Sequence, residues 1–148
     1  MIKVESVLPA ARARLAVIGT GDRLIEAATL LAGPECNLLV VNDERGRIVG
    51  VVTRTDIVAR ISQCTGSSCT TAVKHVMTQD AITCHPDDWL EDVWRIFNER
   101  RLKNIPVVDT DETPHGILNV RDALNALLED VQHEEKLLRD YVMGVGYH

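Results

Sequence analysis

GVVTRTD, residues 50–56, has a layout that GILNVRD, residues 116–122, repeats further along the chain. In both stretches a glycine is followed by two apolar residues, one polar residue, two more residues and an aspartate. The offset is 66 residues for the glycines (116 − 50) and also for Asp56 and Asp122 (122 − 56). An apolar-periodic segment begins at each aspartate, which indicates a strand followed by a helix. The sequence therefore predicts a duplicated structural unit.

The duplication covers most of the chain. Residues 16–61 align with residues 81–127 when one residue is dropped from the first copy. Each copy has a short apolar piece (15–18 or 81–83), expected to be a strand, then a helix, an apolar strand, a polar turn, a second strand and a last helix. Apolar residues spaced i, i+3, i+4 and i+7 mark the buried face of the first helix in the two copies: Leu24, Ala27, Ala28 and Leu31, and Leu90, Val93, Trp94 and Phe97.

Fully apolar strands are typical of a sheet covered by helices, so we predict an α/β (α+β) fold of two tandem β-α-β-β-α units in a pseudo-two-fold pair. The first unit and its N-terminal segment are placed at residues 1–63, and the second unit with a C-terminal helical extension at residues 74–148. Residues 64–73 are predicted to be a linker, because the stretch SQCTGSSCTT (62–71) is small, polar and contains glycine.

The last helix of the second unit is predicted to be longer than its counterpart. Its apolar pattern runs from Asp122 through Val142, and Gly144 is expected to break it. An apolar stripe on the extension needs a partner surface. A helix that folds back on its own sheet and a homodimer both satisfy this need, and a homodimer is the preferred interpretation. The stripe consists of Leu137, Leu138, Tyr141 and Val142.

The composition excludes several classes of function. A net charge of −6 and a sequence pI near 5.3 disfavour nucleic acid as a partner, since phosphates would be repelled. No apolar run approaches the roughly 20 residues of a membrane span, and the N-terminus lacks a signal-peptide core, so a cytoplasmic protein is expected. The four cysteines form no C-x-x-C pair, and no nucleophile or phosphate-loop motif is present, so neither a metal site nor an enzyme is predicted.

The two aspartates are the strongest candidates for chemistry. An aspartate beside the start of a helix can simply cap that helix. It can also accept hydrogen bonds from the vicinal hydroxyls of a ribose, while the helix N-terminus and nearby arginines favour the phosphate of the same ligand. The duplication would then create two related clefts between the units.

Three stretches of the chain resemble the CBS motif. G-x-x-T-x-x-D at Gly50, Thr53 and Asp56 is similar to the segment that closes this motif. IPVVD, residues 105–109, is similar to its central strand, and VMTQDAITCHPDD, residues 76–88, to the segment that opens it. The resemblance extends over nearly the whole chain, and two such motifs in tandem form a Bateman module, here of the small stand-alone type.

The resemblance implies a regulatory module, not an enzyme. It would need no cofactor, bind an adenosine-containing ligand of the AMP, ADP or ATP class, and pass its occupancy to a partner such as an enzyme or transporter. Asp56 and Asp122 would bind ribose, and Asn119 stands where a threonine or serine is usual. The other implied ligand-binding residues are Thr83, His85, Ile105, Pro106 and Arg121 in the second site, and Ile18, Leu38, Thr53 and Arg54 in the first.

A structural or dimerisation protein with degenerate clefts is the alternative. Asn119 motivates it, and so does Leu39, which stands where the motif usually has proline.

Overall fold

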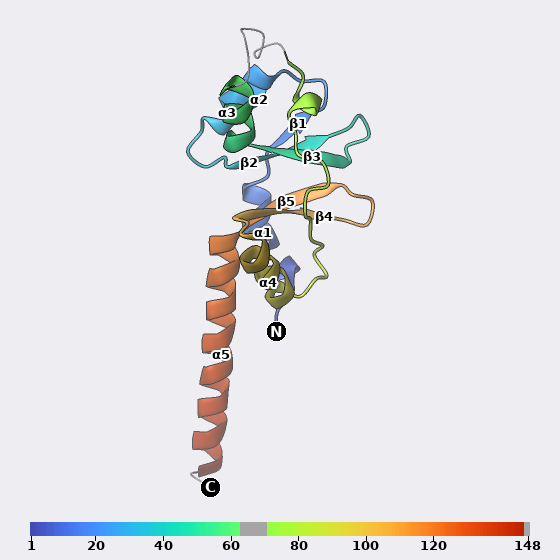
Figure 1. Ribbon diagram of the computed structural model, residues 1–148. Helices are drawn as coiled ribbons and strands as arrows, with labels where there is room; N and C mark the ends of the chain where they lie inside the picture. The colour runs from blue at the N-terminus through green and yellow to red at the C-terminus, as the bar shows by residue number, and fades with distance from the viewer. Residues whose placement is uncertain (63–70, 147–148) are drawn as a thin grey trace.

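The computed structural model describes residues 1–62 and 71–146, with the backbone only for residues 144–146. It has a mixed α/β fold with two repeated units and a long C-terminal helix, as predicted (Figure 1). Three short helices precede the units: η1 (Val4–Val7) and α1 (Leu8–Ala13) before the first, and η3 (Val73–His75) before the second. The first unit contains β1 (Val17–Gly19), α2 (Leu24–Leu31), β2 (Leu38–Asn42), β3 (Ile48–Thr53) and α3 (Arg54–Ser62). The second contains α4 (Leu90–Arg100), β4 (Asn104–Val108), β5 (Pro114–Asn119) and α5 (Val120–Gly146).

The two sheets differ in their first strand. In the first unit β1 runs parallel to β2, which pairs antiparallel with β3. In the second unit only β4 and β5 form a ladder, so the predicted strand at 81–83 is wrong. The chain makes a single parallel bridge there, between Cys84 and Val107. Pro86 follows at once, and so does a turn in which the Asp88 amide donates to the His85 carbonyl (3.0 Å). Together they end the pairing.

Each unit is completed by the segment that precedes the other unit's strands. Val4, Val7 and Ala11, from η1 and α1, lie in the core of the second unit with Leu90 and Phe97. In return Val73 of η3 lies in the core of the first unit, and its amide donates to the Asp22 carbonyl (2.8 Å).

The two matched glycines make this exchange possible. A Cβ on Gly116 would lie 2.6 Å from the backbone carbon of Ala11, and one on Gly50 would lie 2.8 Å from the Thr78 carbonyl oxygen. Val51, next to Gly50, exchanges both backbone hydrogen bonds with Thr78 (3.0 and 2.8 Å). Glycine is therefore required in both copies for close backbone approach.

A third apolar cluster joins the two units. Leu38, Val40 and Val51 of the first sheet pack in one cluster with Ile117 of the second. Because both sheets contribute to it, the hairpins lie as neighbouring layers, which Figure 1 shows between the helices of the two units.

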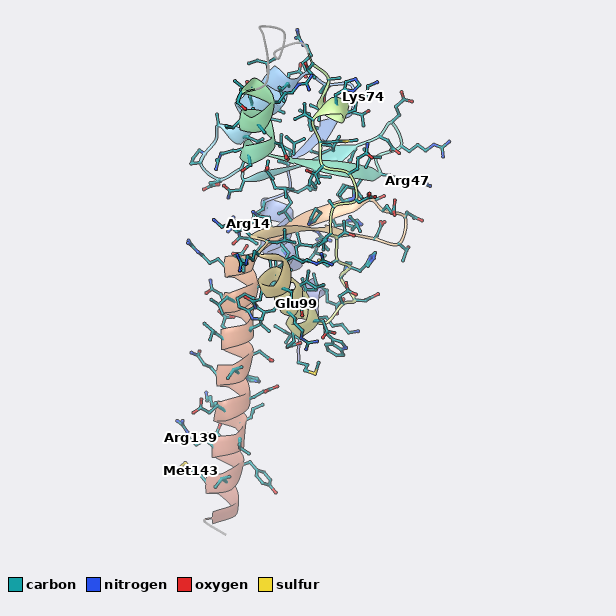
Figure 2. The ribbon with its side chains drawn as sticks, in the orientation of Figure 1. Arg14, Arg47, Lys74, Glu99, Arg139 and Met143 are labelled. Carbon is teal, nitrogen blue, oxygen red and sulfur yellow. The ribbon has the colours of Figure 1, made fainter. Side chains whose placement is uncertain are left out.

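Helix α5 projects away from both sheets (Figure 1). Figure 2 shows Arg139 and Met143 on the part that lies far from the rest of the chain. The stripe is exposed, with Leu138 at 65% and Tyr141 at 70%, so the helix does not fold back on its own sheet. The predicted break at Gly144 is also wrong, since a single interior glycine costs only about 1 kcal/mol relative to alanine.

We predict that Gly116→Ala lowers the free energy of unfolding by about 1–3 kcal/mol, because the new methyl group meets the backbone of α1. Urea denaturation followed by circular dichroism measures the change. Gly21→Ala is the control, since nothing lies within 4 Å of its Cβ position. Equal stability of the two variants would contradict the packing argument.

Candidate ligand-binding site

Asp56 caps α3 and touches the other unit. Its Oδ2 accepts hydrogen bonds from the Thr53 amide (2.9 Å) and hydroxyl (3.2 Å), and its own amide donates to that hydroxyl (3.4 Å). The other carboxylate oxygen, Oδ1, accepts a long bond from the Thr78 hydroxyl (3.5 Å). Asp56 therefore caps α3, while its Oδ1 keeps most of its capacity to accept hydrogen bonds.

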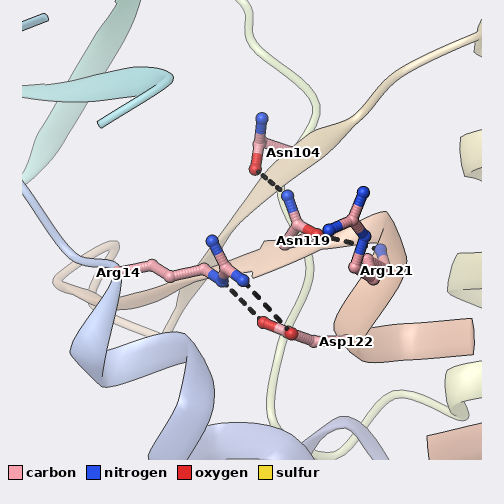
Figure 3. Close-up of polar contacts among 5 residues, drawn as sticks. All are labelled: Arg14, Asn104, Asn119, Arg121 and Asp122. Atoms are coloured by element: carbon pink, nitrogen blue, oxygen red, sulfur yellow. Dashed lines mark hydrogen bonds and ion pairs between the residues drawn. The ribbon is translucent and has the colours of Figure 1, made fainter. Parts of the chain in front are cut away.

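Asp122, in the first turn of α5, is paired with Arg14 (Figure 3). Arg14 directly follows α1. Its Nε donates to Oδ2 of the carboxylate (2.6 Å) and its Nη2 donates to Oδ1 (3.3 Å). The side chains are 33% and 20% exposed, so water reaches the pair only in part. The hydrogen bond to Asp122 raises the pKa of the Arg14 guanidinium above its ordinary value, and this side chain stays charged.

Both carboxylates thus meet the segment that leads into the other unit's sheet: Thr78 for Asp56, and Arg14 for Asp122. Sequence reasoning missed both partners. Arg14 is 108 residues from Asp122, and nothing in the local pattern marks it.

Asn119 performs the same capping task at α5 that Thr53 performs at α3. Its Oδ1 accepts the Arg121 amide (2.9 Å), and its Nδ2 donates to Oδ1 of Asn104 (3.0 Å). The amide group is therefore engaged at both ends, whereas the side chain of Arg121 is exposed at the helix start (Figure 3).

Arg54 holds a loop of its own unit. Its guanidinium donates to the carbonyls of Leu31 (2.8 Å), Gly33 (2.9 Å) and Cys36 (3.0 Å), and to the side chain of Asn37 (2.9 Å). Four of its five N–H groups are used in this way, which leaves one for a ligand.

Four residues predicted for the second site lie in or beside the β4–β5 hairpin. Ile105 is fully buried in the core, and the Pro106 carbonyl accepts the Cys84 amide (3.0 Å). The ring of His85 bonds the Val108 carbonyl (2.9 Å) at the turn end of β4. Asp122 follows the opposite end, and a strand of this length spans roughly 13 Å, so His85 and Asp122 do not meet. Thr83 lines a cleft described below.

In the first unit, Ile18 belongs to the helix-covered core and Leu38 to the cluster between the sheets.

Two clefts adjoin these residues. One, of about 280 Å³, is lined by Ile48, Val49, Gly50, Asp80, Ala81, Thr83, Val108 and Glu112. The other, of about 320 Å³ between α1 and α5, is lined by Ser6, Val7, Pro9, Ala10, Asp122, Asn125, Ala126 and Glu129. Thr83 and Asp122, predicted for one site, line different clefts. Their assignment to a shared ligand stays a prediction.

The family model described as "CBS domain" matches residues 4–63 and 73–129. The chain belongs to the CBS domain family. With two matched segments it is a CBS pair, and such pairs are regulatory modules.

Relatives of this CBS pair include enzymes that carry CBS domains. The chain is 29% identical over 99 residues to L-aspartate semialdehyde sulfurtransferase of Methanocaldococcus jannaschii. That match covers 67% of the chain and 18% of the relative, so the chain spans about a fifth of that protein's length.

Solved CBS pairs share the fold. CBSX2 of Arabidopsis thaliana in complex with AMP superposes with a TM-score of 0.74 at 27% identity, over 87% of this chain and 98% of that one. A CBS domain pair in complex with 5′-methylthioadenosine and S-adenosyl-L-methionine gives 0.72 at 24% identity, over 88% and 98%. At 24% identity, the similarity to this second pair supports only the fold.

Metal ligands, helix hydropathy and thiols are the remaining features of the described part of this CBS pair. Among residues 1–62 and 71–146, no three His, Cys, Asp or Glu side chains cluster in a way that would hold a metal ion. No helix of that part is long and apolar enough to cross a membrane. Burial raises the pKa of the Cys84 thiol to about 12, so it is not a thiolate near neutral pH. Cys64 and Cys69 lie outside the described residues.

We predict that Asn119→Ala lowers the free energy of unfolding by about 1 kcal/mol, because the cap of α5 is lost. Thr29→Ala is the matched control, since the Thr29 hydroxyl only bonds a carbonyl of its own helix. Chemical denaturation of both variants measures the difference. A loss no larger than that of the control would show that Asn119 does not cap the helix.

Proposed function

We propose that this CBS pair is a ligand-sensing module that binds an adenosine-containing ligand of the AMP, ADP or ATP class and transmits its occupancy to a partner. One observation carries the proposal. Asp56 and Asp122 occupy matched positions at helix starts, and each contacts a segment of the opposite unit. A ligand held by either carboxylate would therefore touch both repeats.

The AMP complex of CBSX2 supports this ligand class, since that protein is 27% identical to the chain and covers most of it. In the proposed sites Asp56 and Asp122 accept the ribose hydroxyls, and Thr53 and Asn119 orient the helix starts. Arg121 is exposed beside the second carboxylate and is available to a phosphate. The module itself is proposed to have no catalytic activity, because its chemistry is limited to binding.

Transmission would follow from linkage. A ligand that binds one arrangement of the repeats more tightly shifts the equilibrium toward that arrangement. Asp122 lies in the first turn of α5, a helix of 27 residues and roughly 40 Å. A small change at its start would thus be carried to its projecting end, where a partner protein can detect it.

We further propose that a second copy of the chain covers the exposed face of α5. Leu124, Val131 and Leu138 are spaced by seven residues and are all exposed, which is the spacing of a two-stranded coiled coil. A homodimer would bury this face and place the ligand sites of two modules in one assembly.

Leu138→Gln is expected to weaken the dimer, because it removes an apolar side chain from this seam. Sedimentation velocity measures the mass, with 16.4 kDa for one chain and about twice that for the dimer. Lys136→Gln is the control on the same helix, outside the seam. A wild-type protein that sediments as a monomer at all concentrations would remove the proposed dimer.

A second candidate function is a structural role with no adenosine ligand. It is favoured by the engagement of both carboxylates within the protein, through Thr53 and Arg14.

Ligand binding distinguishes the two functions. We expect AMP, ADP or ATP to raise the melting temperature of the wild-type chain, since a ligand at 100 times its Kd stabilises by about 2.7 kcal/mol. Asp122→Ala is expected to lower the apparent affinity for the nucleotide at least tenfold. Asp111→Ala, in the exposed β4–β5 turn, serves as the control. NADH and S-adenosylmethionine complete the screen. No shift with any of the five compounds at millimolar concentration would favour the structural role.

A further inference from the structure

Arg14 lies where a ribose would have to bind. Its guanidinium takes up one acceptor position on each oxygen of the Asp122 carboxylate, at 2.6 and 3.3 Å (Figure 3). These two oxygens are the ones that a vicinal diol would use. A ligand must therefore share the carboxylate with Arg14 or displace the guanidinium from it.

The displaced guanidinium would need another acceptor. A partly buried arginine that loses a charged partner is destabilised, and water replaces the partner only in part. A phosphate on the ligand supplies a new acceptor that is negatively charged, like the Asp122 carboxylate. Its geometry is also suitable, because guanidinium binds phosphate in the same forked way as carboxylate. A neutral nucleoside supplies none.

We propose that Arg14 is a latch that selects for phosphorylated ligands at Asp122; this inference rests on the proposed function. In the ligand-free state the latch neutralises Asp122 and holds α1 against α5. When a nucleotide binds, its ribose hydroxyls take the carboxylate and its phosphate takes the guanidinium. The ion pair of the protein is thus exchanged for two charged contacts with the ligand.

Acidic residues near Asp122 make a nearby cation important for binding a phosphate. Glu129 lines the same cleft as Asp122, and Glu35 lies near enough to Arg14 to act on its charge. Both acids would repel a phosphate. Among the residues that the structure describes, the Arg14 guanidinium hydrogen-bonds only Asp122, and three of its five N–H groups make no hydrogen bond there. Those groups are available to a phosphate before the latch opens.

The exchange would also act on the arrangement of the repeats. Arg14 directly follows α1, which packs on β5 with Ala11 against Gly116. Movement of Arg14 toward a phosphate would pull on this contact between the N-terminal segment and the second unit. Arg14 thus connects ligand charge to the packing that joins the units.

Isothermal titration calorimetry with AMP and with adenosine tests the latch in the full chain. We expect the wild type to bind AMP at least tenfold more tightly than adenosine. In Arg14→Gln the ratio of the two affinities is expected to fall by about tenfold or more, because adenosine no longer competes with the guanidinium and AMP loses its contact. Arg12→Gln, an exposed arginine of α1, removes the same charge and is expected to leave the ratio unchanged.

A measurement on the wild type covers the case in which Arg14→Gln does not fold. The Nε–H resonance of Arg14, followed by NMR, is expected to shift to different positions with AMP and with adenosine, because only AMP offers the guanidinium a phosphate. An equal shift with both ligands, or none with either, would overturn the latch.

The outcomes separate the latch from the proposed function. If Asp122→Ala abolishes binding while Arg14→Gln keeps the wild-type ratio, the sensor stands and the latch is wrong. If AMP and adenosine bind neither the wild type nor Arg14→Gln, and ADP and ATP do not bind either, the proposed function fails and the latch fails with it.

Discussion

The two units can pack together because the backbone approaches closely at two glycines. Gly50 and Gly116 occupy matched strand positions, and each has the backbone of the other unit's leading segment where a side chain would be. Any larger residue would push that segment away. Because the segments carry core residues such as Val4 and Val73 into the opposite unit, the two repeats complete each other's cores.

The same exchange of leading segments positions the partners of Asp56 and Asp122. The segment that crosses over Gly116 ends at Arg14, which meets Asp122, and the segment that crosses over Gly50 brings Thr78 to Asp56. Asp56 thus bonds Thr53 of its own unit and Thr78 of the segment leading into the other, whereas Asp122 bonds Arg14 of the segment leading into the opposite unit. A ligand that competes for these bonds acts on the contact between repeats, which is the physical basis of the proposed sensing.

Helix α5 extends this arrangement beyond the paired units. Its first turns pack against the second unit, whereas its later apolar residues are exposed. An exposed apolar face of this length is unfavourable in water unless another surface covers it. The helix therefore combines two positions of interest, a carboxylate at its start and an exposed apolar face along its projecting part.

The local structure and its duplication could be predicted from the amino-acid sequence. Apolar spacing placed the buried faces of α2 and α4, and the matched aspartates identified the two helix starts, because such patterns depend on neighbours within a few residues. Three features became clear only in the folded chain: 81–83 forms no strand, α5 continues through Gly144, and Arg14 reaches Asp122. The contact between Arg14 and Asp122 joins residues 108 apart, and a single sequence carries no local signal for it.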